Sequence, residues 1–566
     1  MSFANQYLPI LHWLPRYRKE WLRSDLVAGI TVWAVLVPEA LAYAGIAGVP
    51  PLMGLYTVPI PLFLYILLGT SRQLVVGPDS ATALLSAGVV GAMALSESPH
   101  FFALTSALAL MVGVFFLLVG LFRLGWLANL VSKPVMSGFL QGIVLVTILG
   151  QIPALLGIGG EQGLFFQRLV GYAGQLSVIN PATAAVGLSC LFVLTLLKKK
   201  IPRLPAAMVT AILAILAVSL FDLDAHGVRL TGTPATSLPP LHLPDVEISE
   251  YMQLVPGALA IALLGYVETL GAAEGVSLKD DHDIDPNQEL IALGACNIGS
   301  AFSSGFVAVG SLSKTSVAME AGAKTQLAYL VSGLLALFTL LFLMPLLQNL
   351  PHAALAAIVM EAMIGLDQTQ TIRRVFSFSI LEGCVALIAF SGVLLFGVIE
   401  GIGIGVVLSI IMLLERASHP GTAVIGRIPG IGTYRDVRRH PEAVTVPGLL
   451  IFRFDAELVF PSSRFFVRES LRQIKAAKTE VRVFLINAET INDIDVTGAM
   501  LLLRLRHKLK RKGIELWIAQ MQDPVIDRLR KFDMDRVLLM EHLYPSVSEA
   551  VQRFVQLPQQ KEMEKQ

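Results

Sequence analysis

Fourteen separate apolar runs in the first 420 positions are the feature that most constrains this 566-residue chain. A helix needs about 20 mostly apolar residues to cross a bilayer, and a closed helix satisfies the backbone groups that lipid cannot. The sequence therefore predicts an α-helical polytopic membrane protein. The expected spans are residues 25–45, 50–69, 78–96, 101–121, 128–150, 183–197, 205–221, 252–276, 287–302, 309–322, 325–346, 352–366, 378–397 and 399–416.

Charged residues divide the chain into two blocks. Residues 1–420 hold 19 Lys and Arg and 24 Asp and Glu, whereas the 146 residues that follow hold 24 and 18. The second block also has short apolar runs of strand length at 449–454, 481–486 and 513–520, with helical patterns between them, which predicts a soluble α/β domain. The expected domains are a cytoplasmic N-terminal segment (1–24), a membrane domain (25–420), a linker (421–436), the α/β domain (437–556) and a polar tail (557–566).

The positions of Lys and Arg predict the orientation of the membrane domain. Cytoplasmic loops are enriched in these residues. With the N-terminus inside and fourteen spans, sixteen of them fall inside, and Arg168 and Arg229 fall outside. Lys314 is left within a span. Both termini are therefore expected in the cytoplasm.

Two short segments indicate an internal repeat. Gly, Ser and Thr recur in the same order in Val76–Thr82 and Val309–Thr315, and Glu39 and Glu268 both begin a Glu-X-Leu sequence at a similar spacing. Spans 1–7 (25–221) are thus expected to repeat as spans 8–14 (252–416). Seven is odd, so the second copy enters the membrane from the opposite side, which is a frequent transporter design.

The third and tenth spans follow Gly and non-helical residues, so each is predicted to start inside the membrane. A helix start offers free N–H groups and a partial positive charge. Lys314 adds a full charge, and four hydroxyls add donors. These groups predict an anion site that needs no metal or cofactor. The alternative is that the hydroxyls serve helix packing or bond to their own helix. The four hydroxyls belong to Ser80, Thr82, Ser313 and Thr315.

Three carboxyl groups are also predicted within the membrane: Glu39, Asp79 and Glu268. Such groups usually pair, take up a proton or take part in transport. Glu268 lies in mid-span and is the first choice for coupling proton entry to anion entry, the alternative being a structural hydrogen-bond acceptor. Pro38 is expected to break the first span and turn Glu39 toward a cavity. A pair between Asp79 and Lys314 would cancel much of the positive charge.

Composition excludes several other classes of protein. The formal net charge of +1 does not suit a nucleic-acid binder. The three cysteines lie far apart in apolar stretches and form neither a disulfide framework nor a metal site. The sequence has no Walker A motif and no hydrolase or kinase spacing. We therefore expect neither an enzyme nor a bound cofactor or metal.

Five membrane stretches and one loop of the tail carry a resemblance to a known family. The chain resembles the sulfate permease (SulP) family of anion transporters along nearly its whole length, and its tail resembles a STAS domain. The stretches are Val37–Ala44, Gly77–Ala83, Asp285–Leu290, Gly299–Lys314, Gly322–Leu327 and, in the tail, Asp495–Gly498.

The resemblance implies a core domain of spans 1–4 and 8–11 that moves like an elevator against a gate domain of spans 5–7 and 12–14, in a homodimer of a bacterial-type inner membrane. It implies proton-coupled sulfate uptake, with Glu268 as the coupling carboxyl. Thr497 occupies a position that is phosphorylated in related bacterial regulator domains; a helix-cap role is the alternative. The implied anion pocket is Glu39, Tyr43, Asp79, Ser80, Ala81, Ser313 and Lys314.

Three departures from the family leave the anion open. The family often has Gln at the position of Glu39, Arg at that of Lys314 and a neutral residue at that of Asp79. Bicarbonate, chloride or a dicarboxylate, by exchange or with sodium, is the first alternative. A nucleobase permease and a membrane sensor are further alternatives. The sequence does not indicate which protein or nucleotide the STAS domain would bind.

Overall fold

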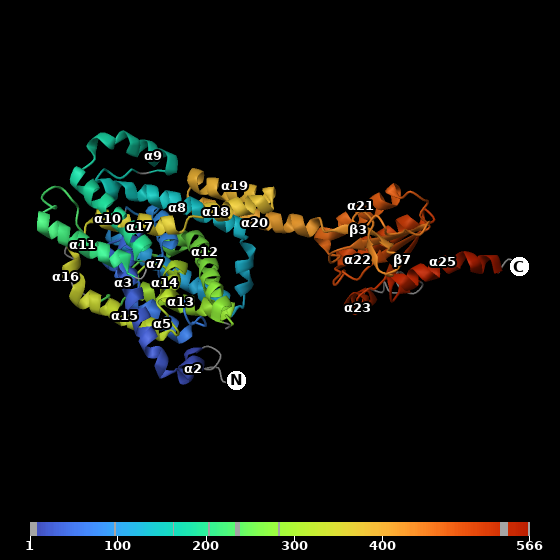
Figure 1. Ribbon diagram of the computed structural model, residues 1–566, viewed down its shortest axis with the longest axis horizontal. Coiled ribbons are helices and arrows are strands. Elements are labelled where there is room, and N and C mark those ends of the chain that lie inside the picture. The colour runs from blue at the N-terminus through green and yellow to red at the C-terminus, as the bar shows by residue number, and fades with distance from the viewer. Residues whose placement is uncertain are drawn as a thin grey trace. The chain divides into compact units, whose positions relative to one another are not determined.

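The computed structural model describes residues 8–95, 98–161, 163–201, 204–232, 238–280, 283–531 and 542–563. The chain divides into two compact units, Met1–Ser409 and Ile410–Gln566, which are described separately (Figure 1). The first seven residues of the predicted N-terminal segment and the last three of the predicted tail lie outside the described residues.

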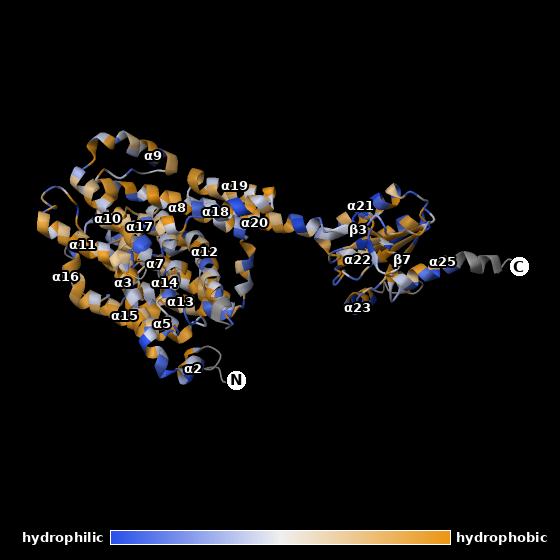
Figure 2. Cartoon of the chain, viewed as in Figure 1, coloured by the Kyte–Doolittle hydropathy of each residue, from blue (hydrophilic) through white to orange (hydrophobic). Residues whose placement is uncertain are grey.

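Each of the fourteen predicted spans contains helix. Eight of the described helices are long and apolar enough to cross a membrane, and Figure 2 shows hydrophobic residues along most helices of this unit. The helices are α3 (Leu22–Ala47), α4 (Pro51–Tyr56) with α5 (Pro59–Leu68), α6 (Ser80–Gly91), α7 (Pro99–Leu121), α8 (Lys133–Leu156), α10 (Pro181–Lys200), α11 (Ala206–Phe221), α12 (Ile248–Asp280), α13 (Pro286–Phe302), α14 (Leu312–Glu320), α15 (Leu327–Phe338) with α16 (Met344–Leu347), α17 (His352–Gly365), α19 (Ile380–Phe396) and α20 (Val398–Ser418).

Two amphipathic helices occupy equivalent places in the two halves. Helix α9 (Phe165–Gly174) lies between α8 and α10, and α18 (Thr369–Phe378) lies between α17 and α19. Neither was predicted, because each is too short and too polar on one face to register as a span. Their matching positions add a structural element to the predicted repeat.

Helices of the first half pack against helices of the second half in equivalent pairs. In one group α7 packs on α13 while its counterpart α15 packs on α5; in the other, α8 packs on α19 while α17 packs on α10. These contacts define two groups, α3–α7 with α12–α15 and α8–α11 with α17–α19, that match the expected core and gate. The contacts are close: a Cβ at Gly138 of α8 would lie 1.9 Å from the carbonyl oxygen of Ala386 in α19.

A two-stranded ribbon joins the halves at the predicted interruptions. Strands β1 (Val76–Pro78) and β2 (Ala308–Gly310) are antiparallel, with Val76 opposite Gly310 and Gly77 opposite Val309. Exchanging the two repeats maps these two pairs onto each other. The ribbon thus lies on the local symmetry axis, and α6 and α14 each begin two residues after it.

The predicted break at Pro38 is wrong. Helix α3 runs unbroken from Leu22 to Ala47 with Pro38 inside it. A proline costs one helical hydrogen bond, and packing against neighbouring helices tolerates that loss in a membrane bundle. Helix α3 packs against α15, α6 and α14. The helix therefore stays straight enough to carry Glu39 and Tyr43 on one face, one turn apart.

The second unit is built on a six-stranded sheet of order β4-β3-β5-β6-β7-β8. The sheet is parallel from β5 to β8, and β3 is antiparallel to both of its neighbours. One face packs Phe452 and Phe484 against α21 and α22, and the other packs Trp517 against α25. The elements are β3 (Thr422–Arg427), β4 (Tyr434–Asp436), β5 (Leu449–Phe454), α21 (Phe460–Ala476), β6 (Val483–Asn487), α22 (Val496–Lys510), β7 (Glu515–Ala519), α23 (Asp523–Lys531), β8 (Leu543–Tyr544) and α25 (Val547–Met563).

The three central strands and the helices of this unit were predicted, but the prediction of a linker at 421–436 is wrong. Most of that segment forms β3 and β4, and β3 pairs with β5. Ala423 and Ile425 are buried in the sheet. The alternation of apolar residues in this segment is short and lies among Gly and Pro residues. These residues are typical of turns, so the sequence favoured a linker over a strand.

Candidate functional site

Lys314 is the centre of the candidate site. Its side chain is 1% exposed although it carries a charge. The Nζ atom donates to the carbonyl oxygen of Pro78 at 2.9 Å and to Ser311 Oγ at 3.3 Å. It lies 3.3 Å from Glu39 Oε2 and 5.1 Å from the centroid of the Tyr43 ring. A buried charge needs such compensation, and here it ties together α3, β1 and α14.

Asp79 has a different partner from the one considered above. It is the N-cap of α6, and its Oδ2 accepts a hydrogen bond from the Ala81 N–H at 2.9 Å. The ion pair of Lys314 is instead with Glu39. The start of α6 is thus partly neutralised by its own cap. The start of α14 has Ser311 as N-cap, but the Ser311 side chain makes no capping hydrogen bond to the helix amide groups, which leaves these groups for another acceptor.

The four hydroxyls of the predicted site divide into two kinds. Thr82 Oγ1 donates to the carbonyl oxygen of Asp79 at 3.3 Å, and Thr315 Oγ1 accepts from the Val75 N–H at 3.1 Å. Both threonines therefore hold the backbone, as the structural alternative proposed. Ser80 Oγ is buried without a hydrogen-bond partner among the described atoms. Ser313 is exposed. Its hydroxyl lies 3.2 Å from Ser311 Oγ. Neither serine is bound to the backbone of its own helix, so the two hydroxyls differ from those of the threonines.

Glu268 lies beside this cluster on α12. Its Oε2 is buried without a hydrogen-bond partner among the described atoms, and the group is within electrostatic reach of Asp79 and Lys314. The next residue, Thr269, anchors α12 to the ribbon, because its Oγ1 accepts from the Gly310 N–H at 2.8 Å. Sequence reasoning missed Thr269 and Ser311, whose roles depend on the ribbon pairing.

A cavity of about 620 Å³ opens the site on one side of the membrane unit. It lies between α3 and α14 of one group and α10, α11 and α17 of the other, and both Glu39 and Ser313 line it. Lys198 and Glu361 form an ion pair in its wall. Lys198 belongs to the end of α10 that the distribution of Lys and Arg assigns to the cytoplasmic side.

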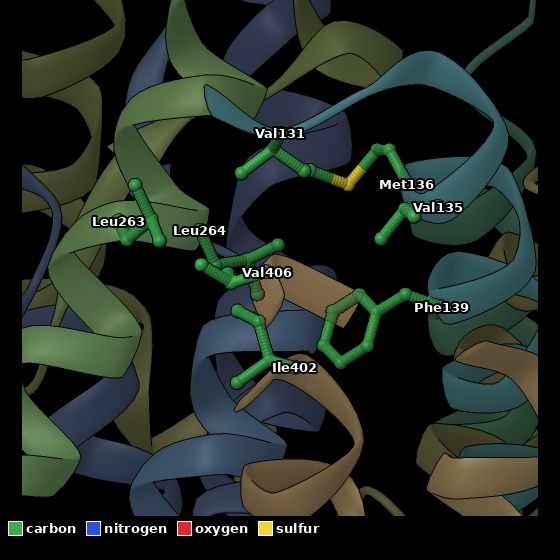
Figure 3. A pocket seen from close by; sticks show the side chains of 8 residues that line it. All are labelled: Val131, Val135, Met136, Phe139, Leu263, Leu264, Ile402 and Val406. Atoms are coloured by element: carbon green, nitrogen blue, oxygen red, sulfur yellow. The ribbon is translucent and has the colours of Figure 1, made fainter. Parts of the chain in front are cut away.

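The repeat relates this cavity to a closed seam. The counterparts of α3, α17 and α11 are α12, α8 and α20, and between these three helices lies a void of only about 10 Å³. Figure 3 shows its lining side chains, all apolar, which come from the three helices and, for Val131, from the segment just before α8. Leu263 and Leu264 of α12 close the seam against Phe139 and Ile402. The cavity at α3 is therefore open, whereas the equivalent place at α12 is closed and apolar.

Thr497 lies in the second unit, exposed in the first turn of α22. The helix is capped by Asp495, whose carboxylate accepts from the N–H groups of Gly498 and Phe460, both at 2.7 Å. The capping role therefore belongs to Asp495, and a regulatory role for Thr497 stays a prediction.

An intramembrane ribbon flanked by two interrupted helices, together with an attached α/β domain, defines a class of membrane transporter. The model of the sulfate permease family matches residues 22–389, and that of the STAS domain matches residues 440–550. The chain therefore belongs to the sulfate permease family and carries a STAS domain.

Relatives and solved structures agree with this assignment. A probable sulfate transporter of Mycobacterium tuberculosis (strain CDC 1551 / Oshkosh) is 36% identical over 95% of this chain and 96% of its own length. The chloroplastic sulfate transporter 4.1 of Arabidopsis thaliana is 30% identical over the whole chain and 85% of its own length. The murine Slc26a9 anion transporter, in the inward-facing state, shares the fold with a TM-score of 0.89 at 22% identity, covering 97% of this chain and 94% of that one.

Proposed function

We propose that the chain is a secondary active transporter that takes up a small inorganic anion, sulfate above all, together with protons. The observation that carries the proposal is the buried Lys314 amine at the ribbon between the two interrupted helices. The anion would lie there against the α14 amide groups, Ser80, Ser313 and Lys314, while Tyr43, Asp79 and Ala81 shape the pocket. Sulfate is favoured because relatives over nearly the full length bear that name.

The charges of the site favour protons as the coupling ion. The proposed site has one amine, Lys314, and three carboxyl groups, Glu39, Asp79 and Glu268. With all three ionised, their charges would outweigh that of Lys314 and repel a dianion. Protons that neutralise carboxyl groups remove this repulsion, so anion and proton bind best together. Glu268, whose Oε2 has no hydrogen-bond partner in the part of the chain that the structure describes, is the proposed coupling group.

The open cavity at α3 and its closed counterpart at α12 support alternating access. If the core group moved against the gate group so that the two halves exchanged conformations, the seam at α12 would open as the cavity at α3 closed. We propose an elevator-like movement of this kind, within a homodimer of a bacterial-type inner membrane whose two termini are cytoplasmic. In this orientation, the open cavity faces the cytoplasm.

Radiolabelled sulfate uptake into proteoliposomes tests the function. An imposed inward proton gradient should drive accumulation above equilibrium, and a protonophore should abolish it. A competition panel of bicarbonate, chloride, succinate and uracil covers the alternative anions and the nucleobase permease. Accumulation that follows a sodium gradient alone would refute proton coupling, and saturable binding without flux would support a sensor.

A further inference from the structure

We infer that Glu39 is an internal competitor of the transported anion: its carboxylate holds Lys314 until it takes up a proton, so that anion binding at Lys314 requires a proton on Glu39. The inference rests on the proposed anion transport and deepens it. It assigns a second proton-carrying group besides Glu268, with a distinct task, because Glu39 controls affinity for the anion directly.

The geometry of the Lys314 amine makes the competition direct. An ammonium group has three N–H donors. Two of them are used by the carbonyl oxygen of Pro78 and by Ser311 Oγ. The Glu39 carboxylate lies 3.3 Å from the amine as its ion-pair partner, without a hydrogen bond between them, and the Tyr43 ring centroid lies 5.1 Å from the amine. An anion that approaches Lys314 therefore competes with the Glu39 carboxylate for the charge of the amine.

Displacing an ionised Glu39 would leave a buried carboxylate without its counter-ion, which is costly. A proton removes that cost. It arrives from water in the cavity and binds a Glu39 carboxylate oxygen, the ion pair with Lys314 breaks, and the anion takes the place of the carboxylate. On the other side of the membrane, release of the anion reverses each step and returns the proton to the solution there.

Glu39 is placed to exchange protons with solution. It lines the 620 Å³ cavity, whereas Glu268 is absent from the described residues that line it. Other charged groups near Glu39 have separate partners or positions. Asp79 caps α6, Glu361 pairs with Lys198, and Glu320 is exposed at the end of α14. Glu320 lines the same cavity and belongs to no ion pair among the described residues, so it is a matched control.

The test measures binding of radiolabelled sulfate to the full-length protein in lipid nanodiscs between pH 5.5 and 8.5. Each proton that is taken up with the anion raises Kd about tenfold per pH unit above the pKa of its group. We expect Glu39→Gln to lower this slope by about one and to bind sulfate at least about tenfold more tightly than the wild type at pH 8.5. Glu320→Gln should follow the wild type.

A slope in Glu39→Gln equal to that of the wild type would overturn the inference and leave the proposed transport intact. Absence of saturable sulfate binding by the wild type at every pH would instead refute the proposed substrate, and this inference with it. Calorimetry of the wild type guards against a variant that does not fold. Sulfate binding in two buffers of different ionisation enthalpy should show proton uptake near pH 7.5, and zero uptake would contradict the inference.

Discussion

In the first half of the membrane unit, the interrupted helix α6 begins at a carboxylate, Asp79, that caps it. In the second half, the equivalent helix α14 begins at Ser311, which makes no side-chain cap, and Lys314 follows in its first turn. The same fold element thus begins with a capping carboxylate in one repeat and with a buried amine in the other. An inverted repeat supplies two symmetrical positions, and their different side chains make the second one the proposed anion-binding position.

The two long helices that flank the ribbon differ in a similar way. Helix α3 brings Glu39 to an open cavity, whereas its counterpart α12 brings Leu263 and Leu264 to a closed apolar seam beside Glu268. The symmetry of the fold and the asymmetry of the conformation together are what alternating access requires. Five experiments test these contrasts.

The largest effect is expected from Glu268→Gln. Proton-driven accumulation of sulfate should be abolished, because the amide cannot carry the coupling proton, while sulfate binding remains measurable. Uptake into proteoliposomes with an imposed pH gradient is the measurement. Glu274→Gln, an exposed carboxyl on the same helix, is the control. Accumulation at the wild-type level in Glu268→Gln would remove this residue as the coupling group.

Lys314→Ala should weaken sulfate binding by about thirtyfold or more. Truncating one partner of a buried charge pair costs roughly 2–5 kcal/mol, and here the site also loses its only amine. Lys314→Arg keeps the charge and should lose much less. Titration of radiolabelled sulfate compares the three proteins. Affinity of the alanine variant equal to the wild type would mean that the α14 amides suffice or that the site lies elsewhere.

Thiol labelling separates the open cavity from the closed seam. In a background without native cysteine, Val317→Cys in the cavity should react with a membrane-impermeant reagent applied from the cytoplasmic side, and Leu264→Cys in the seam should not. The expected difference in rate is about a hundredfold, set by water access. Equal rates would show that the seam is not closed.

Asp79→Asn should strengthen sulfate binding modestly at alkaline pH. Asparagine caps a helix about as well as aspartate, so α6 keeps its start while the site loses one negative charge. A gain of about 1 kcal/mol, or about fivefold in Kd, is expected from a charge at this range. Weaker binding with an unchanged thermal unfolding temperature would show that the carboxylate itself supports the anion.

The smallest effect on selectivity is expected from deletion of the chain from Gly421 onward. This cut removes the whole sheet, including β3 and β4, and leaves the membrane unit. Flux or assembly should fall severalfold, while the order of anions in a competition panel stays the same. A changed order would mean that the STAS domain contributes to the anion site.

The sequence predicted the helical segments and the two interruptions because a bilayer demands long apolar runs and leaves Gly-Ser-Thr breaks conspicuous. It also brought Glu39, Lys314 and Glu268 into one group, since buried charges in a membrane are few. The family resemblance supplied Tyr43 and Ala81, which composition alone would not mark.

The sequence could not predict which side chains of the site pair with one another. Whether Lys314 pairs with Asp79 or Glu39 depends on the path of α3. The predicted break at Pro38 is wrong, although Glu39 does line a cavity as expected. The threonines lost their expected role because both bond to the backbone: Thr315 Oγ1 accepts from the Val75 N–H, and Thr82 Oγ1 donates to the carbonyl oxygen of Asp79. Strands β3 and β4 were missed because pairing with β5, a non-local contact, stabilises a segment whose own pattern is weak.

The most direct test of the central claim is a structure of the protein with selenate, a sulfate analogue whose selenium can be located by anomalous scattering. The account predicts a selenium peak beside the ribbon, within hydrogen-bond reach of Lys314 Nζ and close to Ser80 and Ser313, with the Glu39 carboxyl moved away from the amine. A selenium peak elsewhere, with the ion pair of Glu39 and Lys314 intact, would contradict it.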